Sequence, residues 1–155
     1  MNKILKLNVA IFLIVLLNSC GEKVVFKTDI NQPNQVWNIY KPAVFDVDIQ
    51  DTSKTYKISV ALKLNHRMQE RFIPIDIQTL SPNGESRAAA DYLIMDSALT
   101  VGEFSEFVIQ SNKHFNSPGK YHFSITQRTA KYDLEGIESI GLRVKTTKLK
   151  KITEE

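Results

Sequence analysis

The side chains that could do chemistry in this chain are few and widely spaced. The 155 residues hold one cysteine, Cys20, and three histidines, His66, His114 and His122. The histidines show no H-E-x-x-H spacing, and one cysteine cannot complete a zinc set. The acidic run DVDIQD at 46–51 lacks the glycine turn and the distal glutamate of a calcium loop. These patterns predict no metal site.

Signatures of catalysis are also missing from the sequence. It contains no G-x-S-x-G elbow, no phosphate-binding loop and no dinucleotide fingerprint. Two acid pairs, Glu103 with Glu106 and Asp133 with Glu135, have the residue types of a glycosidase. Exposed acids are the default interpretation of such pairs, because spacing along the chain does not place two carboxylates at a working separation. We therefore expect no enzymatic activity and no cofactor.

Cys20 stands at the end of an apolar leader. Two lysines precede an unbroken apolar run at residues 9–17, and a small polar exit then leads into the cysteine. A positive start, a short apolar core and a small-residue exit are typical of a signal peptide, whereas a membrane-spanning helix needs ~20 apolar residues. We expect residues 1–19 to be a signal peptide.

The residues Leu17-Asn18-Ser19-Cys20 resemble a bacterial lipobox. This resemblance implies that Cys20 carries a diacylglycerol on its sulfur, becomes the mature N-terminus and is acylated there, as with palmitate. Two or three acyl chains hold a protein durably on a bilayer, whereas one binds marginally. The partner expected at Cys20 is therefore membrane lipid. The alternative is a free, buried cysteine in an uncleaved anchor.

The residue after the cysteine bears on which membrane receives the protein. Gly21 follows Cys20, in place of the Asp that often retains lipoproteins in the inner membrane, and no dense acidic cluster comes after it. The resemblance thus implies attachment to the outer membrane, on the periplasmic face.

The elements that must position these residues are indicated by the spacing of apolar side chains, which has a period of two after residue 24. Such alternation is typical of half-buried antiparallel strands. It predicts eight strands, at 24–28, 43–49, 56–64, 72–80, 91–96, 104–110, 121–127 and 139–145. Pro74 cannot donate a ladder hydrogen bond and indicates an edge strand or a bulge. The segment KYDLEGIE at 131–138 is expected to form a brief helix.

Short strands separated by turn residues predict an all-β fold, an antiparallel β-sandwich of jelly-roll type preceded by the signal peptide. Residues 20–42 are interpreted as a lipidated N-terminus and tether, 43–146 as the sandwich, and 147–155 as a tail of basic and acidic residues. The net charge is +3 and the two signs are evenly mixed, so we expect no nucleic-acid partner.

Two aromatic residues beside the expected tether are candidates for binding. Trp37 and Tyr40 flank Asn38, and aromatic rings with a polar edge can stack on sugars or anchor a protein interface. The alternative for Trp37 is a place in the core at one end of the sandwich. If the ring is exposed, a carbohydrate-binding lipoprotein becomes the second functional hypothesis.

Several segments together resemble the gliding-motility-associated lipoproteins of the GldH family. They are the lipobox, PNQVWN at 33–38, PNG at 82–84, and above all SPGKYHFSITQR at 117–128 with LEGIESIGLRVKT at 134–146. The final segment has the family's strand pattern of V/I-G-F/L-R-V/I. Residues 86–113 depart from the family pattern.

The resemblance implies a non-enzymatic outer-membrane lipoprotein, an accessory and interaction component of the gliding machinery and of the secretion system coupled to it. Its partners would be other envelope proteins of those machineries. The family pattern carries over one functional position, Cys20. An interaction module of this kind should expose a contiguous apolar patch.

Overall fold

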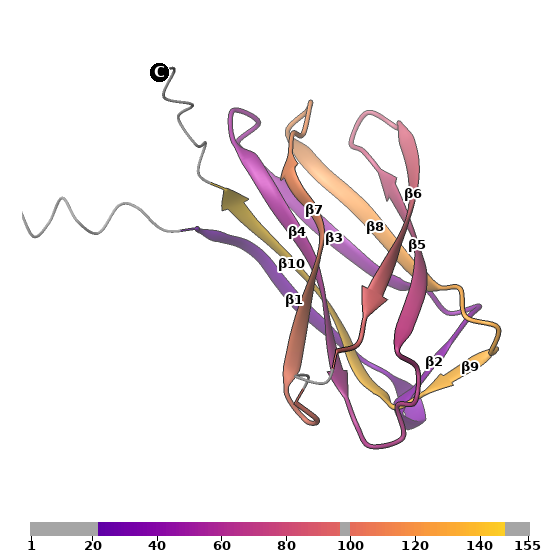
Figure 1. Cartoon of the computed structure of the whole chain (residues 1–155). Coiled ribbons are helices and arrows are strands. Elements are labelled where there is room, and N and C mark those ends of the chain that lie inside the picture. The colour runs from indigo at the N-terminus through magenta and orange to yellow at the C-terminus, as the bar shows by residue number, and fades with distance from the viewer. Residues whose placement is uncertain (1–21, 97–99, 148–155) are drawn as a thin grey trace, which may run out of the picture.

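The computed structural model describes residues 22–96 and 100–147, which form two stacked antiparallel sheets (Figure 1). The first sheet has the order β1 (Val24–Asn31), β10 (Ile137–Thr147), β4 (Thr55–Leu64) and β7 (Phe104–Lys113). The second has the order β3 (Ala43–Ile49), β8 (Gly119–Gln127), β5 (Phe72–Leu80) and β6 (Ser86–Ile94). A 3₁₀ turn, Pro33–Gln35, leads into β2 (Val36–Asn38), which pairs with β9 (Asp133–Glu135).

The strand order confirms the β-sandwich of jelly-roll type. The chain passes back and forth between the sheets, so that β10 returns to lie between β1 and β4, and β8 lies between β3 and β5. Each sheet therefore combines strands that are distant in sequence, as the two Greek keys of a jelly roll require.

The core lies between the two sheets and follows the alternation of the sequence. In β3 buried and exposed residues alternate without exception, with Phe45 and Val47 facing inward. Across the layer they face side chains such as Val60 and Leu142, which are fully buried. Each large aliphatic side chain removed from water contributes about 1.5–3 kcal/mol, so these inner faces hold the sheets together.

The sandwich begins earlier than the sequence boundary at residue 43. All of β1, which the sequence boundary places in the tether at 20–42, pairs with β10 from Val24 to Asn31. The Lys23 carbonyl accepts a bond of 2.8 Å from the Thr146 backbone N–H. Alternation in the first strand was visible in the sequence, but its partner lies at the other end of the chain, so the tether assignment was wrong for 24–38.

The helix expected at 131–138 does not form. Residues 133–135 are the strand β9, and Gly136 then turns the chain with a φ of +89°. A Cβ at Gly136 would lie 2.3 Å from the backbone nitrogen of Met68, so this turn requires glycine. Pairing with β2 replaces the intrahelical hydrogen bonds that a one-turn helix would have made.

Two further expectations about strands need correction. The strand expected at 91–96 begins at Ser86 and ends at Ile94. Pro74 lies in β5, which is an interior strand between β8 and β6, not an edge. Proline is tolerated here because the backbone N–H that it lacks would face residue 128, just past the end of β8. The Pro74 carbonyl still accepts a 2.7 Å bond from the Arg128 N–H.

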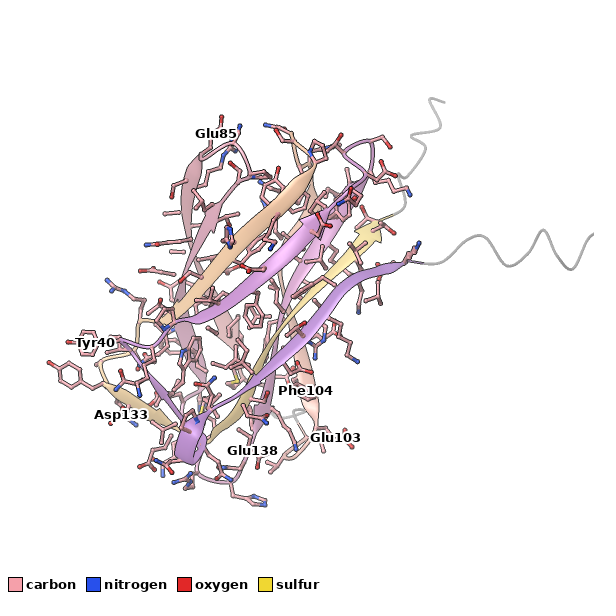
Figure 2. All side chains as sticks on the ribbon, turned by 180° about the vertical axis from the view of Figure 1, so that it is seen from behind. Tyr40, Glu85, Glu103, Phe104, Asp133 and Glu138 are labelled. Atoms are coloured by element: carbon pink, nitrogen blue, oxygen red, sulfur yellow. The ribbon has the colours of Figure 1, made fainter. Side chains whose placement is uncertain are left out.

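The sandwich has two ends, which we call the Lys23 end and the Tyr40 end. At the Lys23 end a row of residues crosses the first sheet, from Lys23 through Thr146 and Tyr56 to Lys113. This end also carries the loops 50–54, 81–85 and 114–118. The Tyr40 end carries the segments 39–42, 65–71 and 128–132. Figure 2 shows Glu85 and Tyr40 far apart, toward these two ends.

No helix in the described part of the chain has the length and apolar character needed to cross a bilayer. The predictions of a signal peptide at 1–19, of a lipidated Cys20 and of a tail after Thr147 lie outside the described residues.

Candidate functional site

Trp37 belongs to the core and does not form a binding surface. Its side chain is fully buried, because β2 and β9 fold over the end of the sandwich and Trp37 pairs with Leu134. The buried side-chain amide of Gln127 holds the segment that leads into β9. It donates to the Lys131 carbonyl at 2.9 Å and accepts from the Thr129 N–H at 2.8 Å. Of the two alternatives for Trp37, the core position is the correct one.

Tyr40 stands on the surface, as a binding residue would. It is 75% exposed and stacks on Tyr132, which is 67% exposed, with ring centroids 6.0 Å apart. Asn38 organises the turn beneath them: its side-chain oxygen accepts from the Tyr40 N–H at 2.9 Å, and its amide donates to Asp133 at 2.6 Å. Figure 2 shows Tyr40 and Asp133 together at this end. We call Tyr40 and Tyr132 the tyrosine pair.

A second group of exposed apolar side chains lies on the outer face of the sheet β3-β8-β5-β6. Phe72, Tyr92 and Ile94 are each more than half exposed, and the rings of Phe72 and Tyr92 meet edge to face at 6.4 Å. Phe72 pairs with Ile94, and Pro74 with Tyr92, so all four lie on one face at the Tyr40 end. We call Phe72, Tyr92 and Ile94 the β5–β6 cluster. It is the kind of exposed apolar group expected of an interaction module.

A cleft of about 300 Å³ opens between β6 and β7, the edge strands of the two sheets. Apolar side chains such as Ile77, Ile109 and Phe115 line it, and Arg87 and Lys113 lie at the Lys23 end. Lys113 is partly buried and lies over the Phe115 ring at 5.8 Å. Burial and the charge of Arg87 both lower the pKa of Lys113.

The outer face of the first sheet carries one buried cation. Arg143 is 2% exposed and lies flat on the sheet, 2.6 Å from Asp29 and with its guanidinium 5.3 Å from the centre of the Phe104 ring. Glu106 on β7, two strands away across β4, lies 4.0 Å from the guanidinium. Both carboxylates and the ring satisfy Arg143 internally, so this group stabilises the fold and is not free to bind a ligand.

The titratable candidates named from the sequence are likewise engaged in local pairs or exposed. Glu106 accepts from Lys145 at 2.9 Å, and His122 lies on the polar face of β8, 2.5 Å from Asp46. Among residues 22–96 and 100–147, no group of three or more His, Cys, Asp or Glu side chains could hold a metal ion.

Sequence reasoning missed the β5–β6 cluster and Tyr132. The cluster could have been found from the alternation of side chains along a strand. Ile73 and Leu93 face the core, so their neighbours in the sequence must face outward. Nothing local pointed to Tyr132, because its contact with Tyr40 depends on the pairing of β2 with β9, which are almost one hundred residues apart.

Comparison with known proteins gives one strong similarity. The model of a protein family described as GldH lipoprotein matches residues 24–144. No curated protein matches the chain. Among solved structures, a serine protease of Aeromonas sobria aligns with 87% of this chain at 13% identity and a TM-score of 0.39, and the chain spans 29% of that protease. A likeness this low bears on neither fold nor activity.

Proposed function

Because the chain belongs to the GldH lipoprotein family, we propose that it is a non-enzymatic interaction component of the gliding-motility machinery and of the secretion system associated with it. In this proposal acylated Cys20 holds it on the periplasmic face of the outer membrane. Its partners are other envelope proteins of the same machineries.

The position of the exposed aromatic residues relative to the anchor supports this proposal. Three residues separate Cys20 from the start of β1, and three extended residues span at most about 10 Å. The Lys23 end would therefore lie close to the lipid headgroups. The tyrosine pair and the β5–β6 cluster both lie at the Tyr40 end, where a lipid-anchored domain presents its surface to other proteins. This placement is the observation that carries the proposal.

Substitution of the β5–β6 cluster tests the proposal. We expect the double variant Phe72→Ser/Tyr92→Ser to remain folded and membrane-bound, since both side chains are more than half exposed, yet to lose colony spreading and to secrete less protein. The matched control is Val108→Ser on the outer face of the first sheet, where an exposed apolar side chain is also removed. Normal spreading and secretion in both variants would remove the support that this cluster provides.

A carbohydrate-binding lipoprotein is the second candidate, and one observation favours it. The two sequence neighbours of Tyr132, Lys131 and Asp133, line a polar pocket of about 250 Å³ together with side chains such as Arg67 and Glu70. Aromatic rings next to convergent polar groups suit sugar binding. Calorimetry with peptidoglycan fragments and lipopolysaccharide oligosaccharides, on the natural protein and on Tyr40→Ala, tests this alternative. Heat of binding that disappears with Tyr40 supports it, and no heat with either class of glycan rejects it.

A further inference from the structure

The edge strand β6 presents a row of backbone hydrogen-bonding groups that have no partner strand. It has one neighbour, β5, with which it pairs over nine residues without a register shift. Bonds from Met95 N–H to the Arg71 carbonyl and from Ser81 N–H to the Glu85 carbonyl set the phase of this ladder. Because hydrogen-bonded and non-bonded pairs alternate, the backbone groups of Ala88 and Ala90 face away from β5. They face the open edge of the sheet.

The other edge strands carry register shifts or outward-facing charges, whereas β6 has neither. Register shifts interrupt β1 and β7 where they pair with their neighbours. The exposed face of β3 carries Asp46 and Asp48. By contrast, the outer face of β6 is uncharged and holds Ser86, Ala88, Ala90, Tyr92 and Ile94. A long, regular edge without outward charges is a ready template for another strand.

The cleft beside this edge has side chains suited to receive a ligand. The inner face of β6, with Arg87, Ala89 and Asp91, forms one wall, and β7 with Ile109 and Gln110 forms the other. Ala89 is exposed although its partner Ile77 belongs to the core, so the two sheets do not close over it. A strand added to β6 would place every second side chain over this cleft.

We propose that β6 receives an extended segment of another envelope protein, which adds a fifth strand to the sheet β3-β8-β5-β6 and directs alternate side chains into the cleft between β6 and β7. The backbone of the segment bonds to Ala88 and Ala90, and its outward side chains pack on Tyr92 and Ile94. The inference deepens the proposed function, on which it rests, by naming the surface and the form of the partner.

The charges in the cleft indicate what the segment carries. Arg87 and Lys113 lie at the Lys23 end of the cleft, and Lys113 is partly buried. Burial and Arg87 both lower its pKa, and an incoming carboxylate would offset these two effects by stabilising the charged ammonium. Further along, Ile77 and Ile109 favour an apolar side chain. Every second side chain of the segment therefore points into the cleft. Most of these side chains are apolar, and the one beside Lys113 is acidic.

A second copy of this chain fits the edge less well. Antiparallel pairing of β6 with β6 would relate the copies by a twofold axis and reverse the direction of one sandwich. The Lys23 end of the second copy would then lie beside the Tyr40 end of the first. Two chains anchored through Cys20 in the same leaflet cannot adopt this arrangement, because both Lys23 ends must face the same lipid surface.

The test uses the full, lipidated chain in the cells that make it, with the photoreactive residue p-benzoylphenylalanine as the probe. It replaces Tyr92 on the outer face of β6 in one strain, and Gln110 in the cleft in another. Val44 on β3 is the control position, because it is also exposed on an edge strand. We expect Tyr92 and Gln110 to crosslink to one and the same short stretch of one partner protein, and Val44 not to.

Two substitutions at one position then test strand pairing itself. Ala90→Pro removes an N–H that faces the open edge and leaves the bonds to β5 intact, so the fold is retained. Ala90→Ser keeps the N–H. We expect Ala90→Pro to lower the crosslink yield about tenfold, which corresponds to the loss of one or two net hydrogen bonds, and Ala90→Ser to leave it unchanged. If Ala90→Pro lowers the amount of folded protein, Lys113→Glu tests docking through its charge contact, because it repels the acidic residue of the segment.

Several results would overturn the inference: crosslinks that join two copies of this chain, crosslinks from Tyr92 and Gln110 to unrelated stretches, no crosslink at either position, or a yield insensitive to both Ala90→Pro and Lys113→Glu. Colony spreading and secretion are measured in the same strains. If Ala90→Pro abolishes the crosslink while spreading and secretion stay normal, strand docking is supported and the proposed function is contradicted.

Discussion

At the scale of single residues, the glycine and arginine of the last strand work as one unit. A Cβ at Gly141 would lie 2.1 Å from Asp29 Oδ1 and 2.5 Å from Arg143 Nη1. The glycine thus makes room for the Arg143–Asp29 ion pair, which lies flat on the sheet and links β10 to β1. The I-G-L-R-V pattern at 140–144 therefore has a structural reason, because its arginine is paired inside the protein.

We expect Asp29→Ala to lower the free energy of unfolding by about 2–3 kcal/mol, because it leaves the buried Arg143 guanidinium without its closest carboxylate. In an Arg143→Met background, where the charge is absent and the covering side chain remains, the same change should cost close to nothing. Urea denaturation of the two single variants and the double variant checks this coupling. Additive costs would mean that the ion pair contributes no stability of its own.

The turn after β3 contains a carboxylate held in its charged form. Ser53 donates to Asp51 through its hydroxyl and its N–H, and Lys54 lies 2.9 Å away. These contacts lower the pKa of Asp51 from 3.8 to about 2. Since the pKa is lower in the folded state, the contribution of Asp51 to stability is present above pH 3.8 and is lost as the pH falls through about 2.

Carboxyl carbon NMR should give a midpoint for Asp51 of about 2. We expect a higher midpoint in Ser53→Ala, because the largest stabilising contact of the charged form, the Ser53 hydroxyl, is then missing. A midpoint near 3.8 in the natural protein would show that the turn does not hold this geometry in solution.

At the scale of elements, the short β2–β9 ribbon closes the Tyr40 end of the sandwich. It brings Trp37 over the core and presents the tyrosine pair outside. The same ribbon thus has a structural face and a surface face. Stability and binding should therefore be separable by substitution within a few residues of each other.

We expect Trp37→Ala to lower the free energy of unfolding by about 3–5 kcal/mol, because it leaves a large cavity under the ribbon. Tyr40→Ala should change it by less than about 0.5 kcal/mol, since the ring is mostly exposed. Thermal and urea unfolding followed by circular dichroism compare the two. Equal stability of Trp37→Ala and the natural protein would contradict the buried position of the indole.

At the scale of the whole molecule, the jelly roll places the proposed lipid contact and the exposed aromatic side chains at opposite ends. The chain enters beside the last strand, at Lys23, and the exposed aromatic clusters lie at the other end. In the proposed anchoring, three residues separate Cys20 from β1, so the length of the sandwich would set how far the Tyr40 end stands from the lipid.

Cys20→Ala should move the protein from the membrane fraction to the soluble fraction without changing its thermal unfolding, because the proposed acyl chains lie outside the folded sandwich. Gly21→Ala is the control, since it changes the neighbouring residue and keeps the cysteine. Fractionation with immunoblotting measures the distribution. A Cys20→Ala variant that stays with the membranes would contradict lipid anchoring through this residue.

Much of the fold could be predicted from local sequence because a strand in a two-layer sandwich must alternate. Residues 43–49 and 72–80 form strands with the predicted bounds. The short ribbon was missed because three-residue strands show too little alternation to be recognised, and 131–138 therefore suggested a helix. Of the two candidate binding residues predicted from the sequence, Tyr40 is exposed and Trp37 is buried in the core.

The amino-acid sequence alone determined the inward and outward alternation of the long strands, the all-β class and the family pattern, since these depend on residue types and on spacing within one strand. Only the tertiary structure decided that β6 is an open edge, that Tyr132 joins Tyr40, and that β1 belongs to the sandwich. The physical reason is that strand pairing joins residues far apart in the chain, such as Val24 and Lys145, and periodicity within a strand does not specify its neighbour.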